Sequence, residues 1–563
     1  MAVEVGAAES VHPLILTAVN RDAVSEALSR VALLLALKGE NPFKVRAFEN
    51  AAEAVHGVPD LEELARDGKL DSVPGIGRSI AAEIAALLST GASPALVSLE
   101  AEVPPTLPDL LRIPGLGVKK AQALWKDLGV TSLGELEYAI RENRLLALAG
   151  FGAKTQEKIA EGLRFVRSAE GRARLPEAWE RAEETRARLR SHAKGAGVSR
   201  VEVAGELRRG CETISGVVLV VACEKPERLP PIPPKPGALP VTVDAGPRET
   251  FGNRLLRATG SAAHLSGLEA RDTGGALGAP AFDEEEIYER LDLAFVPPEL
   301  REGRGEVELA GRRSLPALVE PGDLRGLFHL HTTWSDGKAT LEETFRRAVE
   351  LGYDYVGITD HSPAASYARG LTPQRVKDQW AEIESLRPRF PSLTVLRGTE
   401  ADILPDGSID YGDDFLAGFD FVIASVHSAF RLPRADQTAR ILKAVRNPRV
   451  SMLGHATGRL LLAREGFDVD LAAVLAAAGE AGTGVELNAS PWRLDLDWRW
   501  GEEARRHGVF TSINPDAHDL AGLLDARWGV TAARKAGFLA AEVLGTLPPE
   551  AVSAKLARLR ARA

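Results

Sequence analysis

The pattern of hydrophobic and polar residues divides the chain into a helical first part and a mixed remainder. From Arg21 to about Val166, apolar residues recur three to four positions apart, as Val24, Leu28 and Val31 do. This spacing predicts a series of short amphipathic helices. The Arg- and Glu-rich stretch 167–200 also favours helix.

Strand patterns begin after residue 200. The apolar runs 201–203 and 217–221 predict strands, and the proline-rich segment 229–236 interrupts them. Residues 319–323 are typical of a linker. Beyond them, short β-rich runs alternate with helical segments to the end of the chain, which predicts an α/β barrel-like domain.

Length and composition narrow the class of protein. A chain of 563 residues is too long for one core, and at roughly 150 residues per domain it predicts three to five domains. No apolar run is long enough to span a membrane, and the acidic start of the chain does not resemble a signal peptide. Cys211 and Cys223 lack zinc-site spacing, so we expect reduced thiols and a cytoplasmic protein. A net charge of −10 argues against a chain-wide basic coat for nucleic acid, although local DNA contacts remain open.

A glycine-rich turn recurs three times in the helical part. Each copy has the form Gly-apolar-Gly and precedes a helical segment; the glycine pairs are Gly75 and Gly77, Gly115 and Gly117, and Gly150 and Gly152. Such a turn brings the backbone close to a partner, and the free N–H groups at the following helix start can bind a phosphate. A single copy is equally typical of a tight turn between packed helices. Three copies favour binding of the DNA backbone without sequence readout.

The sharpest chemical signal lies in the last third of the chain. His329 and His331 are two apart in an apolar run, so on a strand both imidazoles face the same side and can reach one ion. Asp336 follows in a Ser-Asp-Gly turn. Later apolar runs end in the same kind of residue, and the further candidate ligands are His361, Glu400, His427, His455, Asp516 and His518.

The number of candidate ligands indicates the kind of site. Active sites of α/β barrels collect at the carboxyl ends of the strands. Six of the 11 histidines fall in these motifs with three acids interleaved, which favours a metal site over six separate structural histidines. Nine ligands exceed what one ion uses, so two or three divalent ions are expected. Mixed His and carboxylate ligation suits manganese, zinc or iron, with manganese or zinc preferred.

This arrangement resembles the PHP (polymerase and histidinol phosphatase) domain. The resemblance implies a distorted β/α barrel that holds up to three ions, with all nine ligand positions matched. Pro515 stands where that family usually has Thr. The rest of the chain resembles bacterial family X DNA polymerases, through segments 41–48, 205–210 and 297–306 and through the 454–459 motif of the PHP part.

The resemblance implies a multidomain fold: α-helical N-terminal helix-hairpin-helix domains, an α+β nucleotidyltransferase-like palm and thumb, and a C-terminal distorted β/α barrel. The expected boundaries are 1–95 for a small helical domain, 96–168 for a fingers-like domain, 169–256 for the palm, 257–318 for the thumb, 319–325 for a linker and 326–563 for the PHP domain. Gly205, Arg208 and Arg209 match the family's nucleotide-phosphate motif, but Glu206 stands where that motif has Ser.

The palm departs from the family pattern where magnesium should bind. Gly216, Val218 and Thr242 occupy the positions of its three aspartates, with Asp244 as a partial substitute. In the nucleotide pocket, Arg257 and Ala258 replace Tyr and Phe. Glycine and valine cannot hold a magnesium ion, which argues against magnesium in the palm. Manganese-dependent synthesis through other carboxylates stays open.

In eukaryotic relatives a lysine on the helix after the first glycine turn acts as a deoxyribose-phosphate lyase. Glu83 stands at that position here.

The leading hypothesis is a DNA repair enzyme whose PHP domain trims 3′ ends. Arg431, Arg434, Arg459 and Arg493 follow the ligand motifs and are candidates to guide the strand, or else belong to a solvated face or structural ion pairs. The expected partners are gapped or 3′-ended DNA, with deoxynucleotides as a further candidate and a monomer assumed. The alternatives are a DNA-binding scaffold with a structural metal site and a small-molecule phosphomonoesterase.

Overall fold

The computed structural model describes residues 20–58, 60–141, 143–191, 195–235 and 238–561. The chain divides into two compact units, residues 1–170 and 171–563. Within the described ranges, no single helix is long and apolar enough to cross a membrane, although the bent pair formed by Arg78–Thr90 and Pro94–Glu102 passes by length and composition. Both cysteines are free thiols.

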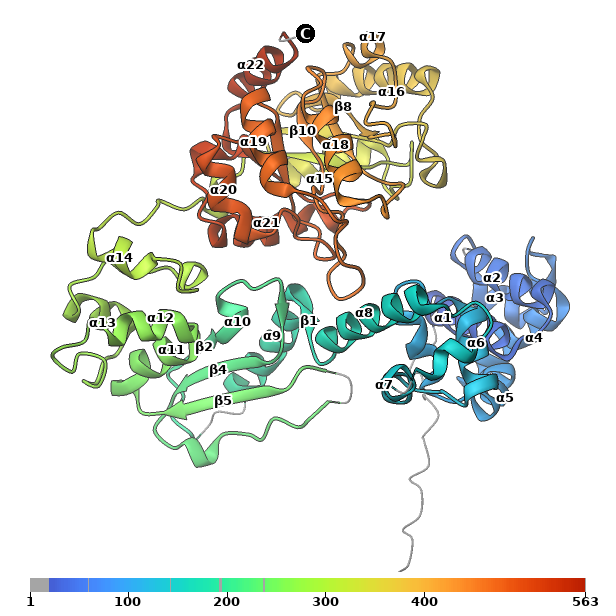
Figure 1. Ribbon diagram of the computed structural model, residues 1–563, viewed down its shortest axis with the longest axis horizontal. Helices are drawn as coiled ribbons and strands as arrows, with labels where there is room; N and C mark the ends of the chain where they lie inside the picture. Colours follow the sequence, from blue (N-terminus) through green and yellow to red (C-terminus); the bar gives the residue numbers. More distant parts are fainter. Residues whose placement is uncertain (1–19, 59, 142, 192–194, 236–237, 562–563) are drawn as a thin grey trace, which may run out of the picture. The chain divides into compact units, whose positions relative to one another are not determined.

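The first unit is entirely helical in its described residues, as the spacing of apolar residues predicts (Figure 1). Its α-helices are α1 (Arg21–Lys38), α2 (Pro42–His56), α3 (Leu61–Arg66), α4 (Arg78–Thr90), α5 (Pro94–Glu102), α6 (Val118–Leu128), α7 (Leu133–Arg141) and α8 (Ala153–Ala169). Val24, Leu28 and Val31 are buried on one face of α1. This apolar stripe packs against α2, α5 and α6 and forms one continuous core.

The stretch 167–200, for which helix was predicted, is helical only in part of its described residues. Helix α8 ends at Ala169, the short strand β1 (Ala173–Arg174) follows, and α9 (Leu175–Ser191) is a separate helix. Gly171, Gly195 and Gly197 have positive φ, at +71°, +101° and +64°. A left-handed backbone ends a helix, and glycine adopts it without a steric penalty.

A three-stranded sheet follows, with the order β2-β4-β5. Its strands are β2 (Arg200–Ala204), β4 (Val217–Ala222) and β5 (Val241–Gly246), and a short helix α10 (Gly205–Arg208) and strand β3 (Thr213–Ile214) lie between β2 and β4. Strands β4 and β5 run parallel, and Val218 lies opposite Thr242 in the register. The two predicted strands are confirmed as β2 and β4, and the pairing of β4 with β5 brings together Val218 and Thr242, two of the positions at which metal-binding aspartates were sought.

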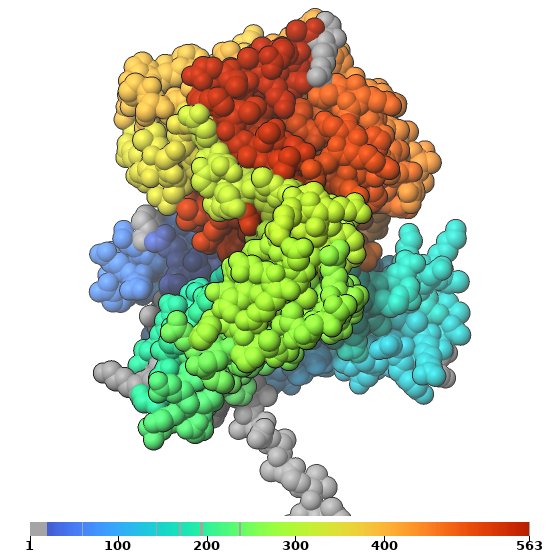
Figure 2. All heavy atoms as spheres, turned by 90° about the vertical axis from the view of Figure 1, so that its left-hand side faces the viewer, coloured from blue at the N-terminus to red at the C-terminus, as the bar shows by residue number. Residues whose placement is uncertain are grey.

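A helical layer continues the second unit, with α11 (Phe251–Thr259), α12 (Ala262–Glu269), α13 (Glu284–Arg290) and α14 (Glu306–Gly311) around their own core. The segment predicted as a linker is not a loose tether. Val319 is fully buried and donates its backbone N–H to the Phe538 carbonyl at 3.0 Å, and Pro321–Asp323 form one turn of 3₁₀ helix. In Figure 2 this yellow-green segment lies against the red C-terminal residues.

The rest of the chain forms a seven-stranded parallel sheet with the order β12-β11-β10-β9-β8-β7-β6. The strands are β6 (Gly326–Leu330), β7 (Tyr355–Ile358), β8 (Thr394–Asp402), β9 (Phe421–Ser425), β10 (Met452–Leu453), β11 (Gly484–Asn488) and β12 (Thr511–Asn514). A parallel bridge between Leu330 and Ala517 joins the two edges. The sheet is therefore a nearly closed barrel, so the carboxyl ends of its strands meet around one opening.

Helices surround this barrel (Figure 1). They are α15 (Leu341–Glu350), α16 (Pro373–Leu386), α17 (Asp413–Leu416), α18 (Arg434–Val445), α19 (Leu471–Ala481), α20 (Gly501–Arg506), α21 (Ala526–Lys535) and α22 (Pro549–Arg560). Helix α15 begins at a reciprocal cap, in which Thr340 accepts from the Glu343 N–H and Glu343 accepts from the Thr340 N–H. Such caps satisfy backbone donors that a helix start otherwise leaves unpaired.

A largely buried carboxylate joins the loop after α10 to the barrel. The Glu212 carboxylate accepts from Arg499 at 2.7 Å and from the Trp498 indole at 3.0 Å. Burial opposes ionisation of Glu212, but the charges of Arg499 and Arg459 outweigh it and lower its pKa from 4.5 to about 2. The carboxylate is therefore ionised in the folded protein over almost the whole pH range.

We expect Glu212→Gln to lower the free energy of unfolding at pH 7 by about 2 kcal/mol, because it replaces the charged acceptor of the Arg499 and Trp498 hydrogen bonds by a neutral amide. The folded-state pKa lies below the ordinary value, so this contribution is complete above pH 4.5 and is lost as the pH falls toward 2. Urea unfolding at pH 7 and pH 3 measures it. A difference between wild type and variant that does not shrink at pH 3 would contradict the assignment.

Candidate metal centre

The first ligand pair sits on a distorted strand. The register between β6 and β7 shifts between Leu327 and Leu330, and His329 in this bulge has φ +61°. A bulge re-aims a side chain, here so that both His329 and His331 face the opening. Asp516, at the end of the facing strand, also has positive φ, at +53°. Left-handed backbone at non-glycine residues is strained, and such strain concentrates at functional sites.

The loop that carries Asp336 is fixed by a buried carboxylate. Asp360 accepts from the backbone N–H of Thr332 at 2.8 Å and from the amide of Gln379 at 2.6 Å, and it also accepts from the hydroxyl of Ser335. A side chain at Gly337 would meet the His331 backbone at 2.5 Å, so only glycine lets the loop fold back this closely. Asp336 is thereby placed next to His331.

All nine residues singled out from the sequence come together at the opening, with Glu400 at their centre. Its two carboxylate oxygens lie 3.0–3.6 Å from nitrogens of five histidines, His329, His331, His361, His427 and His455. Most of the cluster is buried, while His518 and Asp336 keep side-chain exposures of 40% and 29%. These two residues therefore mark the side of the cluster that a substrate can reach.

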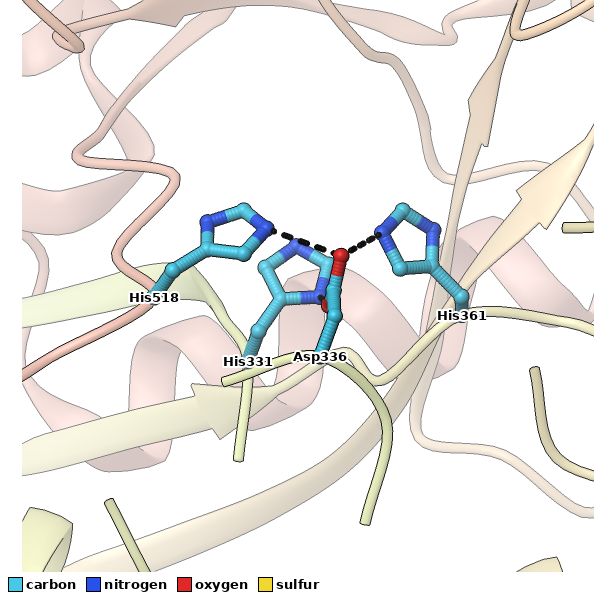
Figure 3. A group of neighbouring side chains, drawn as sticks. All are labelled: His331, Asp336, His361 and His518. Atoms are coloured by element: carbon cyan, nitrogen blue, oxygen red, sulfur yellow. Dashed lines mark ion pairs between the residues drawn. The ribbon is translucent and has the colours of Figure 1, made fainter. Parts of the chain in front are cut away.

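Three subsets have the geometry to hold an ion. His331, Asp336, His361 and His518 form the first, in which Asp336 lies 3.5 Å from both His361 Nε2 and His518 Nε2 (Figure 3). The second is His329, His331 and Asp516, and the third is His361, Glu400 and His427. His331 and His361 each belong to two subsets, so the positions are close enough for bridged ions.

Two further carboxylates orient the histidines. His329 contacts Glu486 through Nδ1 at 2.5 Å, and His427 contacts Asp402 through Nδ1 at 2.7 Å. In both rings Nε2 is left to face the cluster, the arrangement by which outer carboxylates fix the tautomer of a metal-binding histidine. Glu486 also accepts from the backbone N–H of His455 at 2.7 Å. Sequence analysis missed Glu486, which lies inside β11, and Asp402, which lies two residues after Glu400 at the end of β8.

The carboxylates make the cluster a favourable place for positive charge. Burial opposes protonation of His361 and His427, but the neighbouring carboxylates, Glu400 first, raise their pKa to about 10 and about 9. Burial together with His518 and His361 lowers the pKa of His331 to about 3, so its ring is neutral with lone pairs to offer. Protons and metal ions compete for such nitrogens, and carboxylates that attract one attract the other.

The residues present fit a group of divalent cations. Within the described chain, buried nitrogens of His329, His331, His361 and His455 have no hydrogen-bond partner of good geometry. Buried polar atoms are normally satisfied, and a cation satisfies nitrogen lone pairs and carboxylates together. The donor set of imidazole and carboxylate is the one that manganese, zinc and iron accept.

The four candidate arginines lie in different settings. Arg459 is mostly buried, pairs with Asp497 at 2.6 Å and bonds the carbonyl of Arg493 at 2.9 Å. Arg434 is exposed and lies 3.6 Å from Asp470. Arg493 lies 3.5 Å from Asp516, at the site itself, and Arg431 is exposed. Arg459 and Arg434 therefore have the ion pairs that were the alternative interpretation, while Arg493 lies at the metal centre.

The candidate nucleotide-phosphate residues are engaged with the helical layer. Gly205 has φ +68° and starts α10. Arg208 pairs with Glu284 at 2.6 Å, and Arg209 pairs with Glu302 at 2.9 Å. Because both guanidiniums already hold a carboxylate, a triphosphate would have to displace one.

The three glycine turns share one geometry. Gly75, Gly115 and Gly150 have φ of +92°, +83° and +83°, so each turn needs a glycine at its first position. Gly77, Gly117 and Gly152 each precede a helix start, of α4, α6 and α8, with no side-chain cap. A Cβ at any of these three would meet nothing within 4 Å. The space beside each of these glycines is therefore open, and the helix that follows starts without a side-chain cap.

Glu83 on α4 has a structural role. Its carboxylate accepts from the Ser93 hydroxyl at 2.6 Å and from the Ala95 N–H at 3.1 Å, at the start of α5. A carboxylate carries no amine, so Glu83 cannot take the role of a lyase lysine.

Comparison with known protein families identifies three kinds of domain in the chain. Residues 328–490 match the PHP domain, residues 20–93 match a helix-hairpin-helix domain, and residues 107–164 match a SAM-like helix-hairpin-helix tandem. The chain is thus a PHP protein with helix-hairpin-helix modules. Asp516 and His518 lie beyond the matched PHP segment but inside the same cluster.

Similarity to individual proteins over the whole chain identifies the family more closely than the domain matches do. The chain is 36% identical over 568 residues to the DNA polymerase/3′-5′ exonuclease PolX of Bacillus subtilis, which covers 94% of this chain and 98% of that protein. It is 29% identical to a probable phosphatase of Thermoanaerobacter sp. and 31% identical to one of Aliivibrio fischeri, each over 34% of this chain and 77% and 76% of those proteins. The chain belongs to the bacterial family X DNA polymerases that carry a PHP domain. The predicted family and fold class are confirmed.

Proposed function

We propose that this protein degrades DNA from the 3′ end with the metal centre of its PHP domain. The observation that carries the proposal is the cluster of nine ligands around Glu400, which has three overlapping ion-binding subsets. The Bacillus subtilis relative, similar over nearly the whole chain, is named as a polymerase and 3′-5′ exonuclease. As ligands we propose His329, His331, Asp336, His361, Glu400, His427, His455, Asp516 and His518.

The chain's own residues prepare the site for hydrolysis of a phosphodiester. Divalent ions bound here would neutralise phosphate charge and help to deprotonate water. Glu486 and Asp402 hold the rings of His329 and His427 with Nε2 toward the centre. Arg493, 3.5 Å from Asp516, is placed to bind a phosphate oxygen. Burial of the cluster limits competing water and strengthens each of these interactions.

The helix-hairpin-helix turns are the proposed DNA grip. Their uncapped helix starts offer N–H groups to phosphates, which binds DNA regardless of sequence. We propose two or three ions of manganese or zinc, gapped or 3′-ended DNA as the partner, a monomer and a cytoplasmic location. The domain boundaries at residues 95, 168, 256, 318 and 325 belong to the same proposal.

Two other functions are less well supported. A structural zinc site needs about four ligands and is closed, whereas this cluster has nine and an accessible side at Asp336 and His518. A phosphatase acting on small molecules would be consistent with the relatives of that name, but these match only 34% of the chain. The helix-hairpin-helix segments lie outside that third and favour a DNA substrate.

The direct test uses the purified chain and single-stranded DNA labelled at its 5′ end. Degradation from the 3′ end would give a ladder of shortening labelled products in the presence of manganese, and none after chelation. Release of the labelled 5′ nucleotide first, or cleavage of p-nitrophenyl phosphate but not of DNA, would contradict the proposal.

Among the arginines, we expect Arg431 and Arg493 to contribute to DNA binding. Neutralising both by glutamine should weaken binding and reduce the slope of log K against log salt by about 1.4 to 1.8, since each phosphate contact contributes about 0.7 to 0.9. Arg346→Gln is the matched control, because Arg346 is exposed and already paired with Glu342. An unchanged slope in the double variant would remove these residues from the interface.

A further inference from the structure

An exposed aromatic side chain stands at the rim of the metal centre. Tyr367 lies in the 3₁₀ turn Ser366–Ala368 that follows β7, and its side chain is 69% exposed. Its ring centroid lies 6.2 Å from that of His361 and 6.4 Å from that of His427. An exposed aromatic ring so close to the centre is available to a ligand that enters it, because base stacking uses such a ring.

Charged groups of the centre act on the Tyr367 hydroxyl. Partial burial and the carboxylates of Glu400, Asp402 and Asp336 raise its pKa, whereas the charge of Arg493 lowers it. The ring distances to His361 and His427, together with the exposure of Tyr367, place this aromatic side chain at the edge of the centre.

The turn that presents Tyr367 is rigid. Ala368 and Gly370 donate their N–H groups to the Ala365 carbonyl at 3.0 and 3.2 Å. Arg369 donates to the carbonyl of Ser335, which ties the turn to the loop of Asp336. A Cβ at Gly370 would lie 1.9 Å from the Ser362 carbonyl, so the turn cannot relax outward with a larger residue. The ring is thus held in place before any ligand arrives.

A cationic side chain lies at the same centre. Arg493 is 3.5 Å from Asp516, and its charge also acts on Tyr367. The centre thus offers one aromatic and one cationic group, and single-stranded nucleic acid offers bases with phosphates between them.

We propose that Tyr367 binds the base of the 3′-terminal nucleotide by stacking. This inference rests on the proposed nuclease function and names a residue that positions its substrate. Every base has a flat face, so stacking admits all four without sequence preference. A base stacked on Tyr367 is not paired, so a duplex end must fray before its last nucleotide enters.

The test compares two oligonucleotides that differ only at the 3′ end, one with a terminal thymidine and one with a terminal abasic residue. On the thymidine substrate, Tyr367→Ala should lower kcat/KM about tenfold, or about 1.4 kcal/mol. On the abasic substrate the same variant should match wild type within about twofold. Tyr367→Phe keeps the ring and should match wild type on both.

Phe282→Ala is the matched control, since Phe282 is also exposed, at 49%, but contacts Arg248 rather than the centre. An equal loss on both oligonucleotides, or no loss on either, would overturn the stacking role. Failure of the wild-type protein to degrade either oligonucleotide would overturn the nuclease function itself, and the two failures are therefore distinguishable.

Discussion

Replacing His331 by alanine should lower the rate of 3′-end degradation by about 10³-fold or more. His331 belongs to two of the three ion-binding subsets, so its loss weakens both at once. Metal ions contribute several kcal/mol to stabilising charge during phosphodiester cleavage, and each 1.36 kcal/mol is a factor of about ten in rate. The measurements are the degradation rate and the metal content of the purified variant.

DNA affinity separates loss of metal from loss of folding. The glycine turns lie in a different unit, so the DNA dissociation constant of His331→Ala should stay close to wild type. Asp516→Ala should behave in the same way. His507→Ala is a matched control, because His507 pairs with Glu503 outside the cluster. Degradation at wild-type rates in either ligand variant would refute the assignment of the centre.

An intermediate effect is expected from the outer carboxylates. Glu486→Gln keeps the size of the side chain but weakens its hold on His329, and such changes reduce metal affinity or activity by about 10- to 100-fold. In a metal centre, the loss of activity should be larger for the ligand variants than for Glu486→Gln. In a buried polar network without a metal, all these variants should lose a similar amount of activity.

The sequence predicted the centre because its chemistry lies at the ends of strands. Histidine after an apolar run is a local pattern, and parallel strands bring their carboxyl ends together without further information. His331, His361 and His427 were found in this way. Glu486 escaped, since the alternation in Gly484–Asn488 equally indicates a strand with one polar face in solvent. Only closure of the barrel turns that face inward, and closure depends on contacts between β6 and β12.

Long-range pairing explains the other differences. Arg208 and Arg209 match a phosphate motif, yet their partners Glu284 and Glu302 lie 76 and 93 residues away in the chain. Arg459 likewise pairs with Asp497, 38 residues on. The local sequence around an arginine does not show whether its side chain will bind a ligand or pair with a carboxylate far away in the chain. The break at Gly171 is different, because a glycine within a helical pattern is a visible stop signal.

The three-stranded sheet leads to the second large effect, which concerns DNA synthesis. Val218 and Thr242 lie opposite each other on β4 and β5, and Gly216 directly precedes β4. Within the described residues, none of the groups able to hold an ion lies on this sheet. Two acids that were considered as substitutes have partners, Asp244 in Arg254 at 3.3 Å and Glu206 in the Ser215 N–H at 2.8 Å.

We therefore expect magnesium-dependent primer extension to be absent, or at least about 10³-fold slower than metal-assisted nucleotidyl transfer, because no carboxylate cluster is available to hold the ions. The assay uses gapped DNA and His331→Ala protein, so that degradation cannot mask synthesis, with magnesium and manganese compared. Aspartates at positions 216, 218 and 242 should restore only part of the activity, since Arg208 and Arg209 stay paired with Glu284 and Glu302. Robust extension with magnesium that is lost on mutating a different acid would show that synthesis uses another site. Absence of extension with retained DNA binding would leave this sheet as a platform that holds DNA for the nuclease.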